Sequence, residues 1–179
     1  MYIMHKMRKF LMIIKTYFNK LYLTITNEED YMELSQSTKK ILENAGWNSL
    51  RHIDIQPYQE ALSLDGYEIS DKAKTFLAEF GGLELVHPAY RVSNEIDHTH
   101  FDPLRAISGI CHERVETYEE RIGEKLVVIG EGYNEQLVLL ISESGRIFGA
   151  YDDFLTCLGN NTFEALDAIC QRKETPKIS

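Results

Sequence analysis

Apolar residues in the first half of the chain recur every three or four positions, and glycines interrupt each such run. This spacing predicts helices over residues 36–45, from Pro57 to Gly66 and from Ser70 to Phe80. Ser35 suits the N-cap of the first helix, and Gly81 and Gly82 stop the third. The third helix is the most regular, because its apolar residues fall at i, i+3, i+4 and i+7: Ala73, Phe76, Leu77 and Phe80.

An extended pattern replaces the helical one after residue 82. The inward positions of the first strands are predicted to be Leu83, Leu85, Tyr90 and Val92. Pro88 cannot donate a hydrogen bond to a ladder, so a central strand is not expected there. Further strands are predicted from Phe101 to Ile107, Lys125 to Ile129, Gln136 to Ile141 and Arg146 to Tyr151. The short connections between the last three predict an antiparallel meander.

Two further helices are predicted in the second half. One runs from Glu113 to Ile122 and closes at Gly123, and its inward residues are Val115, Tyr118 and Ile122. The other starts at Asn161, which with Glu164 resembles a capping box. Its inward residues are predicted to be Phe163, Leu166, Ala168 and Ile169. Since strands do not alternate regularly with crossover helices, the order predicts a single α+β domain, mainly an antiparallel sheet packed with helices.

The two ends of the chain differ from this middle part. Residues 1–30 form a basic extension with apolar residues at helical spacing, which predicts an amphipathic helix appended to the body. Membrane contact by this helix, and a natural start at Met7, Met12 or Met32, are the alternatives. Residues 173–179 are a polar tail, which leaves 31–172 as the domain. The longest apolar runs have five residues, far short of the roughly 20 that a spanning helix needs.

Charge and cysteine content narrow the class of protein. The 179 residues carry a net charge of -9, which repels nucleic-acid phosphates and disfavours direct binding to DNA or RNA. Residues 1–27 contribute +5, so the remainder carries 14 minus 28, or -14. Three cysteines without a CxxC spacing give neither a disulfide framework nor a zinc knuckle. A reducing cytoplasm is the simplest location.

Several residues could carry chemistry, but each has a simpler interpretation. A metal-ligand cluster is conceivable from side chains that lie close in sequence, namely Asp97, His98, His100 and Asp102. Because these four residues lie in a polar stretch next to Pro103, we interpret them as solvated loop residues. Cys111 and His112 are adjacent, and consecutive side chains point apart, so they do not form a nucleophile and base. Cys157 and Cys170 are expected in the core. We therefore predict no catalytic, metal or cofactor site.

Six motifs then occur in a recognisable order. They are AGW (Ala45 to Trp47) with Arg51, AKTFLAEFGGLEL (Ala73 to Leu85), FDP (Phe101 to Pro103), YEERIGEKLVVIGEG (Tyr118 to Gly132), ESGRIFGAYDD (Glu143 to Asp153) and LGNNTFEALDAI (Leu158 to Ile169). Together they closely resemble the third immunity-protein subfamily of the SUKH superfamily, over about Ser35 to Ile169. The residues that carry the match are expected to be structural: Trp47, Phe76, Phe80, Gly81 and Gly82. Arg51 and Glu79 are expected to pair within the fold.

The resemblance implies the SUKH (Smi/Knr-like) fold and a function. It implies a bacterial immunity protein that binds and occludes a cognate polymorphic or contact-dependent toxin, expected to be a basic nuclease, without turnover. Carboxylates at predicted hairpin loops and strand ends are the expected partner-binding rim: Glu131, Glu135, Asp152 and Asp153. A Smi/Knr-like regulatory scaffold that binds a host protein is the alternative. An enzyme built on Cys111 or on His98 and His100 is a third, less favoured one.

Overall fold

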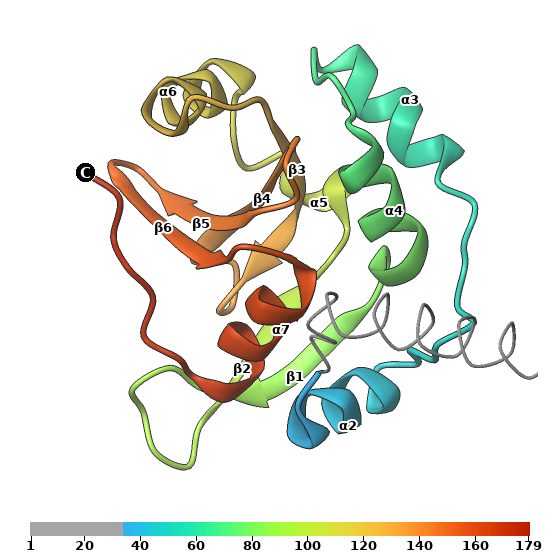
Figure 1. The fold of residues 1–179 in the computed structure, drawn as a ribbon, viewed down its shortest axis with the longest axis vertical. Helices are drawn as coiled ribbons and strands as arrows, with labels where there is room; N and C mark the ends of the chain where they lie inside the picture. The colour runs from blue at the N-terminus through green and yellow to red at the C-terminus, as the bar shows by residue number, and fades with distance from the viewer. Residues whose placement is uncertain (1–33) are drawn as a thin grey trace, which may run out of the picture. The chain divides into compact units, whose positions relative to one another are not determined.

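The computed structural model describes residues 34–179, which fold as helices around one six-stranded sheet (Figure 1). The elements are α2 (Gln36–Asn44), α3 (Gln56–Leu64), α4 (Asp71–Phe80), β1 (Glu84–Pro88), β2 (Ile96–His100), α5 (Pro103–Ala106), α6 (His112–Ile122), β3 (Leu126–Gly132), β4 (Leu137–Ser142), β5 (Ile147–Tyr151), β6 (Phe154–Gly159) and α7 (Thr162–Gln171). This is the α+β domain that the sequence predicts. The predicted extension, residues 1–30, lies outside the described residues. Within 34–179, no helix combines the length and the apolar character that crossing a membrane requires.

The helices begin where the sequence places their caps. The Ser35 hydroxyl accepts a hydrogen bond from the Thr38 backbone N–H at 3.3 Å, and the Ser70 hydroxyl accepts one from Ala73 at 3.1 Å. Asn161 Oδ1 accepts from the N–H groups of Phe163 and Glu164, both at 3.0 Å. Each side chain satisfies a donor that the first helical turn leaves without a partner, so the predictions for α2, α4 and α7 are confirmed.

All strands pair antiparallel with their sequence neighbours, in the order β1-β2-β3-β4-β5-β6. Strand β1 lies at one edge, as Pro88 indicates, and β3, β4 and β5 form the predicted meander. The opposite edge, β6, is covered by the end of the chain. The Cys157 N–H donates to the Pro176 carbonyl at 3.3 Å, and the Ile178 N–H donates to the Leu155 carbonyl at 2.8 Å.

The region from 96 to 107 differs from its prediction. The strand predicted from Phe101 to Ile107 is wrong, because Pro103–Ala106 form α5. Asp102 Oδ1 accepts from the Leu104 N–H at 3.0 Å and Pro103 fills the first turn, and both features start a helix. The polar loop predicted before it is also wrong: it contains strand β2, in which Thr99 and His100 are buried.

One strand was not predicted, and several predictions about single residues are wrong. The strand is β6, which follows β5 after a two-residue turn. Val92 is 43% exposed because it lies in the loop beyond β1, and Phe163 is 39% exposed in the first turn of α7, where it faces solvent. Cys170 is buried as expected, whereas Cys157 is only half-buried.

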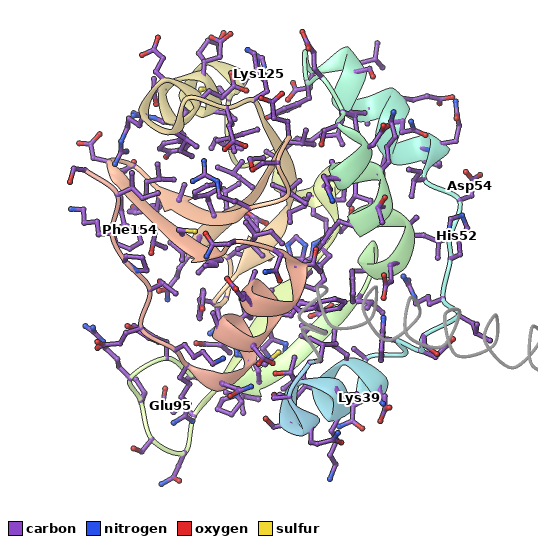
Figure 2. The ribbon with its side chains drawn as sticks, viewed as in Figure 1. Lys39, His52, Asp54, Glu95, Lys125 and Phe154 are labelled. Atoms are coloured by element: carbon purple, nitrogen blue, oxygen red, sulfur yellow. The ribbon has the colours of Figure 1, made fainter. Side chains whose placement is uncertain are left out.

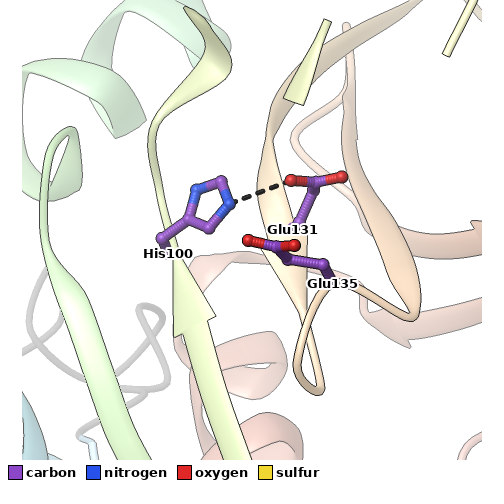
Figure 3. A group of neighbouring side chains, drawn as sticks. All are labelled: His100, Glu131 and Glu135. Carbon is purple, nitrogen blue, oxygen red and sulfur yellow. Dashed lines mark hydrogen bonds and ion pairs between the residues drawn. The ribbon is translucent and has the colours of Figure 1, made fainter. Parts of the chain in front are cut away.

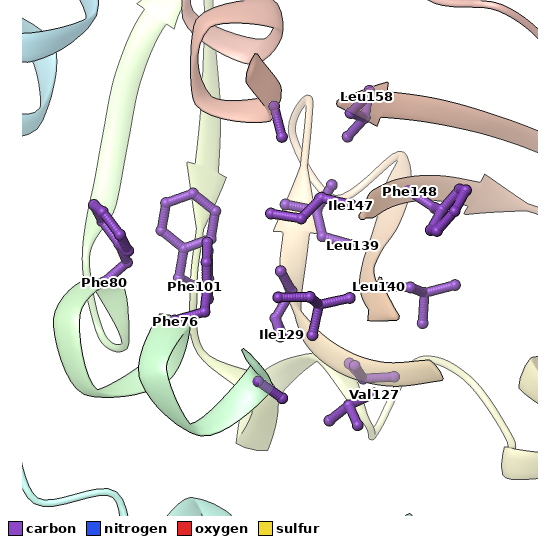
Figure 4. Packing of buried hydrophobic residues seen from close by; sticks show 14 of the residues in the cluster. Phe76, Phe80, Phe101, Val127, Ile129, Leu139, Leu140, Ile147, Phe148 and Leu158 are labelled. Atoms are coloured by element: carbon purple, nitrogen blue, oxygen red, sulfur yellow. The ribbon is translucent and has the colours of Figure 1, made fainter. Parts of the chain in front are cut away.

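The core is formed by the curved sheet and the helices that it holds. Helix α7 contacts β6, β5 and also β1 at the opposite edge, so the sheet curves around this helix. Helix α4 packs on β3 and β4. In Figure 4, Phe76 and Phe80 of α4 lie beside Phe101, with the apolar side chains of the meander across from them. The Phe76 ring meets Phe101 edge to face at 5.1 Å, a favoured aromatic geometry.

Residues of the motif around Trp47 hold the C-terminal end of α4. Arg51 donates from Nη1 to the Glu79 carbonyl at 2.5 Å and from Nη2 to the Gly81 carbonyl at 2.7 Å. The cation thus binds carbonyls at the negative end of the helix, and not the Glu79 carboxylate. That carboxylate accepts from Trp47 Nε1 at 3.0 Å, while the indole stacks on Phe80 at 6.3 Å. These contacts tie the segment that follows α2 to the end of α4.

Two glycines of β3 provide a matched test of how closely β2 and β3 approach. A Cβ atom on Gly130 would lie 1.9 Å from the His100 carbonyl oxygen, whereas one on Gly132 would meet nothing closer than 3.4 Å. We expect Gly130→Ala to lower the free energy of unfolding by about 3 kcal/mol or more, and Gly132→Ala by less than about 1 kcal/mol, in urea titrations. Equal losses for the two variants would show that β2 and β3 do not approach this closely.

The carboxylate of Glu124 makes an acid-sensitive contact with the β4–β5 turn. Its oxygens accept from the Ser144 N–H at 3.1 Å and from the Arg146 guanidinium. Burial acts to raise the pKa of Glu124, but hydrogen bonds from Ser144, Ser142 and Arg146 outweigh burial and lower the pKa to about 2. The pKa of a glutamate without these bonds is 4.5, so the contact contributes its full stability to the fold above pH 4.5. This contribution is lost as the pH falls toward 2.

We expect Glu124→Gln to flatten the dependence of unfolding free energy on pH between 4.5 and 2, because glutamine cannot titrate. Glu143→Gln in the exposed part of the same turn is the control and should keep the wild-type slope. Urea unfolding at several pH values measures both. An unchanged slope in Glu124→Gln would contradict this assignment.

Candidate functional site

A groove of about 1020 Å³ lies on the surface of the described residues, and four segments distant in sequence form it. They are the β1–β2 loop, the β3–β4 hairpin, the β5–β6 hairpin and the segment after α7. Aromatic side chains line much of it: Tyr90, Tyr133, Tyr151 and Phe154. Figure 2 labels a residue from each of two walls, Glu95 in the β1–β2 loop and Phe154 at the start of β6. Tyr151 is 62% exposed and Phe154 38%, so apolar surface faces solvent here.

Backbone strain is concentrated around this groove. Among the described residues, seven that are not glycine have positive φ: Arg91, Asn94, Tyr133, Asn134, Glu135, Asp152 and Arg172. Four of them line the groove, and each of the other three is adjacent in sequence to a lining residue. Such conformations cost of order 1–3 kcal/mol each and persist where the surrounding structure enforces them, commonly at functional sites. The groove is therefore the candidate functional site.

Asn134 holds the strained β3–β4 hairpin in place. Its N–H donates to the His98 carbonyl and its Oδ1 accepts from the His98 N–H, both at 2.9 Å. Its Nδ2 donates to Asp97 Oδ1 at 2.7 Å, and Asp97 Oδ2 accepts from the Tyr90 N–H at 3.0 Å. Asp97 thus joins the hairpin to the β1–β2 loop. Both walls of the groove are fixed by polar contacts to β2.

A buried polar cluster lies beneath Tyr133. His87 Nε2 is 2.8 Å from the Thr99 hydroxyl, and the Tyr133 ring meets His87 edge to face at 5.8 Å. Burial lowers the pKa of His87 and raises the pKa of the Tyr133 phenol, so both groups are neutral near pH 7. Tyr133 also contacts Tyr90 at 6.2 Å. The floor of the groove is therefore uncharged and mostly aromatic.

The charges on the walls are nearly balanced and mostly paired. Arg91 of the β1–β2 loop meets Glu174 across the groove at 3.0 Å, and Arg105 meets Glu135 at 2.9 Å. Lys173 pairs with Asp167 at 3.4 Å. Lys177 lies 6.0 Å from the centre of the Phe154 ring, and no acidic group among residues 34–179 pairs with it.

The structure separates the residues that resembled a metal cluster in sequence. Asp97 bonds to Asn134 and Tyr90, Asp102 caps α5, and His98 lies 3.6 Å from Glu84. His100 instead meets Glu131 and Glu135, and the ligand atoms of these three lie within 4.8 Å of one another (Figure 3).

The hydrogen bonds of His100 favour a polar pair over a metal site. Nδ1 accepts from the Asp102 N–H at 3.3 Å, so a neutral ring carries its proton on Nε2. Nε2 then donates to Glu131 Oε2 at 3.0 Å. An imidazole that binds a metal through Nε2 needs the opposite arrangement, with Nε2 free and the proton on Nδ1, and here the Asp102 N–H also occupies Nδ1. Arg105 next to Glu135 further opposes a bound cation.

The acidic residues expected at the partner-binding rim lie in two places. Glu131 and Glu135 are neighbours, but Glu131 is engaged with His100 and its side chain is only 13% exposed. Glu135 is 61% exposed and lines the groove. Asp152 and Asp153 form the exposed β5–β6 turn, between the groove residues Tyr151 and Phe154. Glu135, Asp152 and Asp153 thus border the groove, and Glu131 lies behind Glu135.

Sequence reasoning missed the aromatic lining. Tyr90 was expected to face the core, while Tyr133 and Phe154 lie in segments for which no element or site is predicted. The available signal was an aromatic residue directly beside turn residues at both hairpins, as in Tyr133-Asn134 and Asp153-Phe154. That signal is weak, because turn-flanking aromatics also pack into cores.

The cysteines lie outside the groove lining, and two of them are poor nucleophiles. Burial raises the pKa of Cys170 to about 12 and also raises the pKa of Cys157, so both are protonated thiols near pH 7. Cys111 is exposed just before α6, and the adjacent His112 ring packs edge to face on Tyr67 at 4.6 Å.

Comparison with known proteins finds one family. The model of the SUKH-3 immunity protein family matches residues 34–172, which is most of the chain. No curated protein and no solved structure matches. The matched part contains every helix and strand described above and ends just before the segment that forms one wall of the groove.

The strain at the β3–β4 hairpin is measurable through Glu135, whose φ is 62°. Both Glu135→Gly and Glu135→Ala remove the ion pair with Arg105, but only glycine adopts this φ without strain. We expect the glycine variant to be more stable than the alanine variant by about 1 kcal/mol in urea unfolding. Equal stability of the two would mean that Glu135 is not strained.

Proposed function

Because the chain belongs to the SUKH-3 immunity protein family, we propose that it binds a cognate toxin domain and neutralises it by occlusion, without catalytic turnover. The toxin is a nuclease of a polymorphic or contact-dependent system, and the encounter takes place in the cytoplasm. The domain predicted over residues 31–172, together with the groove wall at residues 173–177, is the toxin-binding unit. The family supports the immunity role, and the identity of the toxin is our inference from charge and surface.

The observation that carries the proposal is the coincidence of strain and exposed aromatic surface at one groove. Interfaces obtain most of their binding energy from a few aromatic and arginine anchors, and the groove offers Tyr90, Arg91, Tyr151 and Phe154. Its walls are loops and hairpin turns, which can change in sequence between homologues while the sheet stays constant. A toxin-specific surface needs this combination of a fixed support and variable contacts.

Charge supports a basic partner. Residues 34–179 hold 14 basic and 24 acidic side chains, a net charge of -10. Nucleases that bind phosphate backbones carry basic surfaces, so an acidic protein meets them faster than a neutral one. We place the acidic contacts at Glu135, Asp152 and Asp153, with Glu131 supporting Glu135 from behind. The aromatic side chains then provide affinity, and the acidic margin provides encounter rate.

The acidic margin is tested with isosteric neutral variants. Combining Glu135→Gln, Asp152→Asn and Asp153→Asn should slow association with the toxin domain encoded by the neighbouring gene by about tenfold at low salt. The control neutralises three exposed acids outside the groove lining, with Glu43→Gln, Glu60→Gln and Glu143→Gln. Because both triples remove the same net charge, the difference between them reports the location. Stopped-flow or surface-based kinetics measures the rates.

Three outcomes are informative. A wild-type on-rate that falls steeply with added salt agrees with steering. Equal rates for the two triples would move the toxin contact away from this margin. Failure of the wild-type protein to bind or inhibit the neighbouring toxin domain would refute the immunity proposal for that partner and favour a regulatory scaffold of the Smi/Knr-like kind.

A further inference from the structure

The segment after α7 lies beyond the family match, yet it forms one wall of the groove. The match ends at residue 172, while Lys173, Thr175 and Lys177 line the groove. Arg172 adopts a left-handed conformation with φ of 60°, and the Lys173 N–H donates to the Ala168 carbonyl at 3.1 Å. This turn ends α7 and directs the chain along β6.

Backbone contacts fix this segment in an extended conformation. The Pro176 carbonyl accepts from the Cys157 N–H and from the buried Thr156 hydroxyl, at 3.3 and 2.9 Å. The Ile178 N–H donates to the Leu155 carbonyl at 2.8 Å, and its own carbonyl accepts from Arg121 Nη2 at 2.7 Å. The Ile178 side chain packs against the core. The wall is thus held by hydrogen bonds to its main-chain groups, by the contact between the Thr156 and Thr175 hydroxyls at 2.8 Å and by the Ile178 side chain.

Alternation along the extended segment separates anchoring from recognition. Successive side chains of an extended segment point to opposite faces, so Lys177 lines the groove while Ile178 packs against the core. The main chain of Lys177 forms a β-bridge with Thr156, but its side chain makes no hydrogen bond or ion pair within residues 34–179 and lies near the Phe154 ring. Its side chain can therefore change without loosening the wall.

We propose that residues 173–177 are a specificity-determining wall of the toxin-binding groove and that Lys177 receives an acidic side chain of the toxin. This inference rests on the function proposed above. Lys177 is the groove cation that lacks an acidic partner within residues 34–179, while Arg91 and Lys173 are already paired. A carboxylate here is the complementary group, and an adjoining apolar side chain of the toxin would pack on Phe154 and Tyr151. The local contact is opposite in sign to the overall attraction between the two proteins.

A charge reversal with a matched control tests this. We expect Lys177→Glu to weaken binding of the neighbouring gene's toxin domain at least tenfold in Kd by calorimetry, because two carboxylates then face each other. Lys40→Glu, an equal change of charge at an exposed position on α2, should alter Kd less than twofold. Lys177→Arg should retain most of the affinity, since it keeps the cation. Thermal unfolding of each free variant should match the wild type.

The outcomes distinguish this inference from the proposed function. If wild-type protein binds the toxin but Lys177→Glu binds equally well, the wall does not set specificity and the immunity function stands. If the wild type does not bind, both fail. If Lys177→Glu lowers both the affinity and the melting temperature, Lys177 stabilises the fold instead of contacting the toxin, and the inference is overturned. Amide exchange is the second readout: toxin should protect the backbone of 173–178, and unchanged exchange there would also overturn it.

Discussion

The junction between β2 and β3 determines how the two halves of the domain are joined. The β1–β2 hairpin lies on one side, and strands β3 to β6 lie on the other. The strands pair in register only at His100 and Glu131, next to the point where Gly130 gives the His100 carbonyl room to approach. The same two residues also pair through their side chains at 3.0 Å. A small number of close, directional contacts thus makes one sheet from two strand groups.

The groove lies across this junction and depends on it. Its β1–β2 wall and its β3–β4 wall come from opposite sides, and the bonds of Asn134 to His98 and Asp97 extend the junction to the rim. The strained residues lie on the loops that these contacts hold. Strain of this kind requires rigid support, and the buried sheet supplies it. The motif residues around Trp47 and Arg51 act elsewhere, at the end of α4, where they stabilise the fold that carries the groove.

Two electrostatic scales operate in this protein. The domain as a whole is acidic, which acts at long range and is screened by salt. The groove is close to neutral, and several of its charges are paired with neighbouring residues, so binding to it would depend on shape, aromatic area and the few groups left unpaired. Under the proposed function, the overall charge attracts basic proteins and the groove distinguishes among them. The paired His100 and Glu131, which a search by residue type would select as a metal site, belong to the support beneath that surface.

The sequence by itself determined the elements whose causes are local. Caps at Ser35, Ser70 and Asn161, the regular apolar face of α4, the short connections of the meander and the edge position marked by Pro88 are all set by neighbouring residues. The ordered motifs likewise identified the family. What only the tertiary structure decided is where polar segments are buried. Strand β2 resembles a loop in sequence because its buried polar residues Thr99 and His100 find their partners on other strands, His87 on β1 and Glu131 on β3. The groove could not be predicted from the sequence either, because four segments distant in sequence form it and no local pattern indicates that they lie side by side.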